Sequence, residues 1–425
     1  MTNNDVIIIN YEMIPYATAW GPCQRSYYLA EFLTNKGINT TVAANKLTDR
    51  YNDYEKKPNF KIIFTNNKGS CNSTFQNRYT TRIAHHLKNF IKPIIYTAER
   101  LYFNEINQGS GLGAFLWVNK LLSQLNDLID PNKKTVIIIS CPPFASLAVI
   151  NKIKKSYPRV RIIIDYRDPW NLWNNARGLS FVREKKYIKL ADKIAVTTDT
   201  LKDVIINTFN VNEDKVAVIA NGYSEKDWSD IEYTPKNNNK IVVSYIGSIV
   251  FQNGTYRNTT EFFKAYDLLE DKDLYEIRFI GVTSTPETES LRQKYPEISF
   301  IPKVSASESF RYMYESDVLF NLHTEKGPSS KYLIGGKIYD YIRSGKLILS
   351  INSKKSFEQT LLKQTGNAIC CENNHLEILR AFKQIKTEPT KHRFDTRMDT
   401  NRIRAFSREY QNDKYYELIK QTASN

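Results

Sequence analysis

Cysteine and histidine are scarce in this chain, and neither occurs with the spacing of a metal site. Five cysteines stand among 425 residues without a CxxC pair, and Cys370 and Cys371 are adjacent. The five histidines also lack ligand spacing. Structural zinc sites and disulfide frameworks use characteristic cysteine spacings. We therefore expect reduced thiols and no zinc.

Long apolar runs are missing as well. No run approaches the roughly 20 apolar residues of a membrane-spanning helix, and the N-terminus has no basic-then-apolar leader. The net charge is +15, from 60 Lys plus Arg against 45 Asp plus Glu. Such a balance favours anionic partners, either a membrane surface or nucleic acid. Helix-turn-helix, zinc-finger and RRM signatures are absent and the charge is spread along the chain, so nucleic acid is not the expected partner. We expect a cytoplasmic protein.

What the sequence does contain is a regular alternation of short apolar strands with helical patterns. It forms two blocks, because a polar stretch at 223–240 interrupts it. The first block has strand patterns at 6–10, 40–44, 61–64, 136–140, 161–165, 193–196 and 215–219. The second has them at 241–247, 275–281, 298–302, 317–322, 346–350 and 367–371. Each block predicts a parallel sheet with helical crossovers, that is, an α/β fold.

A chain of 425 residues is too long for one ordinary hydrophobic core, so we expect two domains. The predicted boundaries are 1–225 for the first domain, 226–239 for a linker and 240–400 for the second domain. Residues 401–425 have a helical pattern and are expected to pack back on the first domain.

The strand at 161–165 ends in the most informative motif, DYRDPW. Its apolar run indicates a strand buried on both faces. Polar groups at the carboxyl end of such a strand lie where open α/β sheets bind ligands. Asp165, Arg167 and Asp168 are therefore candidate functional residues. The alternative is that Asp165 and Arg167 form a structural ion pair.

A second motif, SSKYLIGGKIYDYIRSGKLILS, spans residues 329–350. Gly335 and Gly336 precede a short helical pattern, and a glycine-opened helix start offers backbone N–H groups and a positive dipole end to phosphate. Lys337 adds a full charge in the first turn, and Asp340 follows three residues later on the same face. The motif could hold a diphosphate through Lys337 and a ribose diol through Asp340.

Together these motifs resemble those of the retaining GT-B glycosyltransferases of the family-4 group, particularly bacterial enzymes of surface-polysaccharide synthesis. The resemblance covers most of the chain and is weakest between residues 65 and 130. The matching elements, in order, are the loop with Trp20-Gly21-Pro22, SCPPF (140–144), DYRDPW (165–170), VIANGY (218–223), SYIGSI (244–249) and GGKIYDYIRSGKLIL (335–349).

This resemblance implies a GT-B fold, in which two Rossmann-like domains face a central cleft. It implies an enzyme that moves a sugar from a nucleotide-sugar donor to a glycan or polyprenyl-linked acceptor, with retention, in capsule, lipopolysaccharide or exopolysaccharide synthesis. The first domain would be the acceptor side and the second the donor side. The nucleotide-sugar is a substrate, so no cofactor is expected.

The resemblance also assigns roles to residues of the second domain. Gly247 would let the backbone approach the donor, Arg257 and Lys337 would clamp the diphosphate, and Asp340 would bind the ribose. Ser330, or the backbone near it, would help to hold the sugar. Alternatively, Gly247 only shapes a turn and Arg257 is a solvated charge.

In the first domain, Asp168 is the candidate catalytic or acceptor-side carboxylate, and Gly21 and Arg167 are expected to line the cleft. Gly21 could equally shape a turn alone. Positioned cations stabilise a departing diphosphate electrostatically, so the enzyme is predicted to work without metal. The single Asp-x-Asp, at 271–273, is interpreted as a solvent-exposed charged turn.

Two features depart from the family pattern. Tyr332 stands where many members have the first of two glutamates, and Cys141 lies in the segment where many have a histidine. A catalytically inactive partner subunit therefore stays an alternative, beside a nucleic-acid-binding or nucleic-acid-modifying protein.

Residues 78–103 carry five basic residues against one acid, interleaved with apolar and aromatic ones. Such a segment can lie on an anionic bilayer, which would place the protein peripherally at the inner face of the cell membrane. A pair of ordinary packed helices is the alternative.

Overall fold

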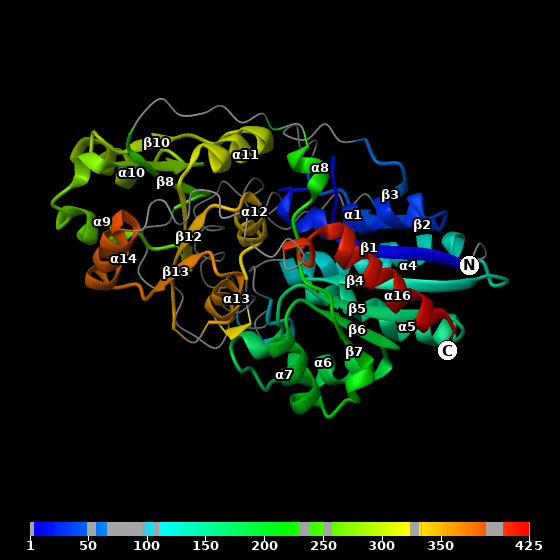
Figure 1. Cartoon of the computed structure of the whole chain (residues 1–425). Coiled ribbons are helices and arrows are strands. Elements are labelled where there is room, and N and C mark those ends of the chain that lie inside the picture. Colours follow the sequence, from blue (N-terminus) through cyan, green and yellow to red (C-terminus); the bar gives the residue numbers. More distant parts are fainter. Residues whose placement is uncertain are drawn as a thin grey trace, which may run out of the picture. The chain divides into compact units, whose positions relative to one another are not determined.

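The computed structural model describes residues 4–48, 57–65, 97, 101–105, 110–229, 231, 239–249, 257–323, 331–332, 334–354, 356–387 and 403–424 (Figure 1). The chain divides into two compact units, Met1–Asn221 with Gln411–Asn425, and Gly222–Tyr410. Ser330 and nearly all of the segment 78–103 lie outside the described residues.

The first unit is built on a parallel sheet of seven strands in the order β3-β2-β1-β4-β5-β6-β7. The strands are β1 (Asn4–Glu12), β2 (Asn39–Asn45), β3 (Lys61–Thr65), β4 (Lys134–Cys141), β5 (Arg161–Tyr166), β6 (Lys193–Val196) and β7 (Val216–Val218). The order reverses direction between β1 and β4. At such a switch point the carboxyl ends of the strands leave room for a ligand.

Alternate residues of these strands enter two separate cores, because successive side chains point to opposite faces of a sheet. On one face, Val6 and Ile8 of β1 pack with α1 (Gly21–Asn35) and α16 (Arg408–Ser424). On the other face, Ile7 and Ile9 pack against four other helices. These are α4 (Ser110–Leu128), α5 (Val149–Ser156), α6 (Leu179–Leu190) and α7 (Asp199–Phe209).

The second unit has a parallel sheet of six strands in the order β10-β9-β8-β11-β12-β13, with its switch point between β8 and β11. The strands are β8 (Ile241–Ile246), β9 (Tyr275–Ile280), β10 (Ser299–Ile301), β11 (Val318–His323), β12 (Leu347–Asn352) and β13 (Ala368–Cys371). The predicted two-domain α/β fold class is therefore confirmed.

Helices cover both faces of this second sheet. The core on one face includes α9 (Thr260–Asp267) and α14 (His375–Thr387), with α10 (Pro286–Lys294) at its margin. The core on the other includes α11 (Ala306–Glu315), α12 (Lys337–Ser344) and α13 (Phe357–Thr365). The buried Trp228 of α8 (Glu225–Trp228) joins this second core.

Near the two ends of the second unit, two chain segments run beside each other. Tyr223 forms a parallel bridge with Ser407, and the backbone N–H of Arg408 donates to the Tyr223 carbonyl at 2.7 Å. Gly222 permits this approach, since an added Cβ would lie 2.5 Å from the Phe406 carbonyl oxygen. A side chain at residue 222 would thus separate the two segments.

Candidate functional site

The switch point of the second sheet carries a cluster of predicted donor residues. Gly247 follows β8 with a φ of 137°, which disfavours any residue with a side chain. Its N–H donates to the Ile280 carbonyl at 2.7 Å, and an added Cβ would lie 2.7 Å from the Lys337 Nζ. The backbone conformation therefore favours glycine here, and the lack of a side chain leaves room for the Lys337 ammonium group.

Lys337 is the first residue of α12, and its ammonium group reaches back to the end of β8. The Nζ donates to the Ile246 carbonyl at 2.6 Å and stands 4.1 Å from the centre of the Tyr245 ring. Burial, and then the nearby positive charge of Arg257, lower the pKa of Lys337 to about 7, although Glu358 opposes the shift. No carboxylate among the described residues forms an ion pair with Lys337.

Arg257 lies at the same strand end. Its guanidinium donates to the Ser248 hydroxyl, and Ser248 is fixed in turn because its carbonyl accepts the Tyr245 hydroxyl at 3.1 Å. Two cations thus gather beside Gly247 at the carboxyl end of β8, next to the first turn of α12. Like charges held together in this way lose repulsion when an anion binds between them. The arrangement suits a diphosphate.

Asp340 has different surroundings, although it is only three residues from Lys337. Burial raises the pKa of its carboxyl group to about 7, and the nearby Arg408 opposes this shift while Asp227 adds to it. Its neighbours therefore belong to α8 and to the start of α16, whereas those of Lys337 belong to β8. The role of Asp340 toward a ribose stays a prediction, as does that of Ser330.

A buried polar network at the ends of β11 and β12 was missed in the sequence. Glu358, the second residue of α13, accepts hydrogen bonds from Asn321 at 2.8 Å and Ser350 at 3.0 Å. The Nδ1 of His323 lies 3.3 Å from its other oxygen. Burial opposes ionisation of Glu358, but the bonds from His323 and Asn321 outweigh it and lower the pKa. No local sequence pattern indicates this network, because its members come from three separate elements.

In the first unit, Asp165 has a structural partner. Arg25 of α1 donates to both carboxylate oxygens at 2.9–3.1 Å, and both side chains are buried. The same guanidinium donates to the Ala220 carbonyl at 3.0 Å. The alternative pairing of Asp165 with Arg167 is therefore wrong, because a helix far away in the sequence supplies the cation.

Arg167 instead holds the turn after β4. Its guanidinium donates to the carbonyls of Cys141 at 3.2 Å, Pro22 at 3.0 Å and Pro142. These backbone acceptors belong to the first turn of α1, to the last residue of β4 and to the residue that follows it. Arg167 thus ties the segment that follows β5, on which Asp168 lies, to the start of α1, where Gly21 lies. Its predicted place in a cleft stays a prediction.

Asp168 is the second carboxylate of the DYRDPW motif, and its surroundings differ from those of Asp165. It is half-buried at the carboxyl end of β5, and it makes no hydrogen bond to any other described residue. Burial raises the pKa of the Asp168 carboxyl group, and Arg167 partly opposes this. A half-buried carboxylate that receives no hydrogen bond from a described residue is able to accept a proton.

Gly21 begins α1 and is exposed. An added Cβ would meet no atom within 4 Å, and the preceding Trp20 gives the helix no side-chain cap. Packing therefore does not explain a glycine at this position. The helix start is open at Gly21, and the close approach of a ligand to it stays a prediction.

The Asp271–Asp273 turn lies just before β9 begins, at the amino ends of the strands of the second sheet. Gly247 lies at the opposite, carboxyl ends. Asp271 pairs with Lys386 of α14 at 2.5 Å. Within the part of the chain that the structure describes, no cluster of histidine, cysteine or carboxylate side chains could hold a metal ion. In the same part, no helix is long and apolar enough to cross a bilayer.

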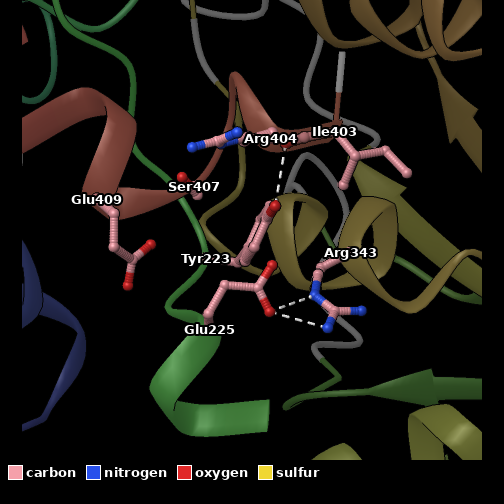
Figure 2. Close-up of a pocket in the computed structure, with 7 residues that line it drawn as sticks. All are labelled: Tyr223, Glu225, Arg343, Ile403, Arg404, Ser407 and Glu409. Carbon is pink, nitrogen blue, oxygen red and sulfur yellow. Dashed lines mark hydrogen bonds and ion pairs between the residues drawn. The ribbon is translucent and has the colours of Figure 1, made fainter. Parts of the chain in front are cut away.

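A cavity of about 480 Å³ in the second unit lies beside the last turn of α12 (Figure 2). It is lined by Tyr223, Glu225, Arg343, Ile403, Arg404, Ser407 and Glu409. An ion pair and a hydrogen bond connect its walls. Arg343 pairs with Glu225 at 2.8 Å, and the Tyr223 hydroxyl donates to the Ile403 carbonyl at 3.1 Å. None of the predicted site residues that the structure describes lines it.

No family model matches the sequence, and neither does any curated protein. Solved structures do match. Sucrose-phosphate synthase from Thermosynechococcus elongatus aligns over 98% of both chains with a TM-score of 0.65 at 14% identity. A glycosyltransferase from Rickettsia africae aligns over 100% of both chains with a TM-score of 0.65 at 12% identity.

HepE from Anabaena, determined with UDP and glucose, aligns over 98% of this chain and 99% of its own with a TM-score of 0.59 at 11% identity. Likeness at such low identity shows the fold. The predicted GT-B architecture is confirmed at that level: the chain has the two-domain α/β fold of the GT-B glycosyltransferases.

Proposed function

We propose that the protein is a glycosyltransferase that moves a sugar from a nucleotide-sugar donor to a glycan or polyprenyl-linked acceptor. The observation that carries this proposal is the cluster of Gly247, Arg257 and Lys337 at the switch point of the second sheet. Two cations beside an open backbone and a helix start suit the diphosphate of such a donor.

The chemistry needs the bond between the anomeric carbon and the diphosphate to break. Its electron pair leaves with the diphosphate, whose growing negative charge Lys337 and Arg257 would stabilise. The acceptor hydroxyl oxygen forms the new bond to the anomeric carbon and releases its proton. Asp168 is the proposed acceptor-side carboxylate for that proton. With protein cations at the diphosphate, the reaction as proposed needs no metal and no cofactor.

The finer parts of the proposal rest on the resemblance of the sequence motifs. These parts are retention of configuration, a role in bacterial capsule, lipopolysaccharide or exopolysaccharide synthesis, and work at the inner face of the cell membrane. HepE was determined with UDP and glucose, which supports a UDP-sugar as the first donor to test.

Thermal unfolding of the wild type and Lys337→Ala with UDP-, GDP-, CMP- and dTDP-sugars tests the donor site. A ligand at a hundredfold excess over its Kd stabilises the fold by about 2.7 kcal/mol. Loss of Lys337 should weaken binding by about 1.5–3 kcal/mol, as for a hydrogen bond to a charged group. Lys363→Ala, at an exposed position on α13, is the matched control. Equal affinity in the wild type and Lys337→Ala would remove Lys337 from the site.

The pH dependence of binding sharpens this test. Since the pKa of Lys337 is about 7, the free protein carries its charge mainly below that pH. Binding of a diphosphate above pH 7 must then take up a proton, so affinity should fall between pH 7 and 9. Lys337→Arg should remove most of this fall, because arginine stays charged.

A further inference from the structure

Exposed apolar side chains gather at the start of α6. Leu179 and Val182 are 62% and 63% exposed, and they lie on one side of the helix because they are three residues apart. Leu101 is 59% exposed, and its backbone lies beside the residue that precedes α6, since an added Cβ on Gly178 would be 3.9 Å from the Leu101 carbonyl oxygen. Single exposed leucines are ordinary, but a group of them marks an interaction surface.

Tyr102 extends the group. Its ring lies 4.1 Å from the guanidinium of Arg183, which also donates to the Tyr102 carbonyl at 2.9 Å. Tyr102, and with it the neighbouring Leu101, is thereby held at α6 by contacts among described residues. They are the end of the basic amphipathic segment 78–103 that the sequence marked for membrane contact.

The remaining exposed residues of α6 are all lysines. Lys185, Lys186 and Lys189 follow the apolar pair along the helix, and none of them pairs with a carboxylate of the described residues. The single acid of α6, Glu184, is fully buried and accepts hydrogen bonds from Asn171. The outward side of the helix is thus apolar at its start and purely positive toward its end.

We propose that this α6 surface, formed by Leu101, Tyr102, Leu179, Val182, Lys185, Lys186 and Lys189, docks on an anionic lipid bilayer. The aliphatic side chains enter the boundary between headgroups and acyl chains, and the lysines contact lipid phosphates. The inference rests on the proposed function, since a polyprenyl-linked acceptor is found at such a surface.

The apolar part decides between a bilayer and a nucleic acid, the other polyanion that three lysines could attract. Nucleic acids are bound by basic residues together with aromatic rings on which bases stack. The α6 surface offers aliphatic side chains instead, and one face of its single aromatic ring already carries the Arg183 guanidinium. Aliphatic groups gain nothing from a phosphate backbone, whereas they gain from acyl chains.

Flotation of the full chain with vesicles tests the docking. We expect binding to vesicles of phosphatidylglycerol mixed with phosphatidylcholine, none to phosphatidylcholine alone, and release by salt. K185E/K186E should lower partitioning by at least roughly 30-fold, because loss of each lysine costs about 1 kcal/mol near an anionic surface and the two added carboxylates are repelled by it. K363E/K383E changes the net charge equally at exposed positions of α13 and α14 and should bind as the wild type does.

The apolar contribution has its own matched pair. L179S/V182S should weaken vesicle binding several-fold even at low salt, whereas Leu268→Ser, at a 52% exposed position of the second unit, should not. Thermal unfolding of each variant establishes that it is folded. Docking through α6 is overturned if the wild type does not float, if both α6 variants float unchanged, if the control variants lose binding equally, or if an oligonucleotide binds more tightly than the vesicles.

Nucleotide-sugar stabilisation, measured on the same samples, separates this inference from the proposed function. A wild type that is stabilised by a nucleotide-sugar but does not float would sink the docking alone. A wild type that floats through α6 but is stabilised by no nucleotide-sugar would sink the transferase proposal alone.

Discussion

At the scale of single residues, the two aspartates of DYRDPW have opposite surroundings. Asp165 is enclosed by Arg25 in a buried ion pair, and Asp168, three residues later, lacks a hydrogen-bond partner among the described residues. Breaking a buried ion pair from one side leaves the other charge uncompensated. The same substitution at the two positions should therefore have different consequences.

Asp168→Asn should leave the melting temperature and nucleotide binding unchanged and lower turnover by about 10²-fold or more, as for loss of a positioned acid–base group. Asp165→Asn should instead destabilise the fold by about 3–5 kcal/mol, because Arg25 loses its partner. Steady-state turnover and chemical unfolding of both variants check this. Normal turnover in Asp168→Asn would assign the chemistry elsewhere.

Glu184 predicts a pH dependence of stability. Burial raises the pKa of this carboxyl group from 4.5 to about 7, against the hydrogen bonds from Asn171. Between these values the folded state binds more protons than the unfolded state, so the free energy of unfolding falls as pH rises and levels off above about 7.

Glu184→Gln should not show this fall, and relative to the wild type it should gain roughly 3 kcal/mol between pH 4.5 and pH 8. Urea unfolding at several pH values measures this gain, with the exposed Glu270→Gln as a control. Parallel stability curves for wild type and Glu184→Gln would show that Glu184 is ionised in the folded protein.

At the scale of elements, the pairing of the two segments around Tyr223 and Ser407 depends on a glycine. An added Cβ at Gly222 would lie 2.5 Å from a backbone oxygen, which no side-chain rotation can relieve, whereas at Gly21 it would meet nothing within 4 Å. Gly222→Ala should cost about 1–3 kcal/mol, as overpacking does. Gly21→Ala should cost less than about 0.5 kcal/mol. Equal unfolding free energies for the two variants would mean that the segments separate without cost.

At the scale of the whole molecule, the second sheet places the cations Lys337 and Arg257 together at its switch point. If Lys337 and Arg257 neutralise the leaving diphosphate, a divalent ion has no task there. Transfer should therefore continue in excess EDTA, measured as release of nucleotide or as labelled product. Loss of activity in EDTA with recovery in Mg²⁺ or Mn²⁺ would contradict this and would direct attention to carboxylates outside the cluster.

The alternation of strands and helices was readable in the sequence because it is a local property. Runs such as Ile162–Ile164 are buried on both faces, and parallel strands covered by helices demand that composition. The glycine pair Gly335-Gly336 likewise indicated where a helix begins, and α12 starts at Lys337. Strand ends followed by polar residues also located the two edges where a ligand is expected.

Tertiary structure alone decided which side chains meet. Arg25 and Asp165 are 140 residues apart, and Lys337 and the Ile246 carbonyl are 91 apart, so no local pattern relates them. Their proximity follows from the order of strands in each sheet, which brings distant loops to one edge. The sequence by itself determined the α/β class and the candidate residues. Only the folded chain separated the structural Asp165 from Asp168 and placed Lys337 beside Gly247, because burial and charge pairing are properties of assembled elements.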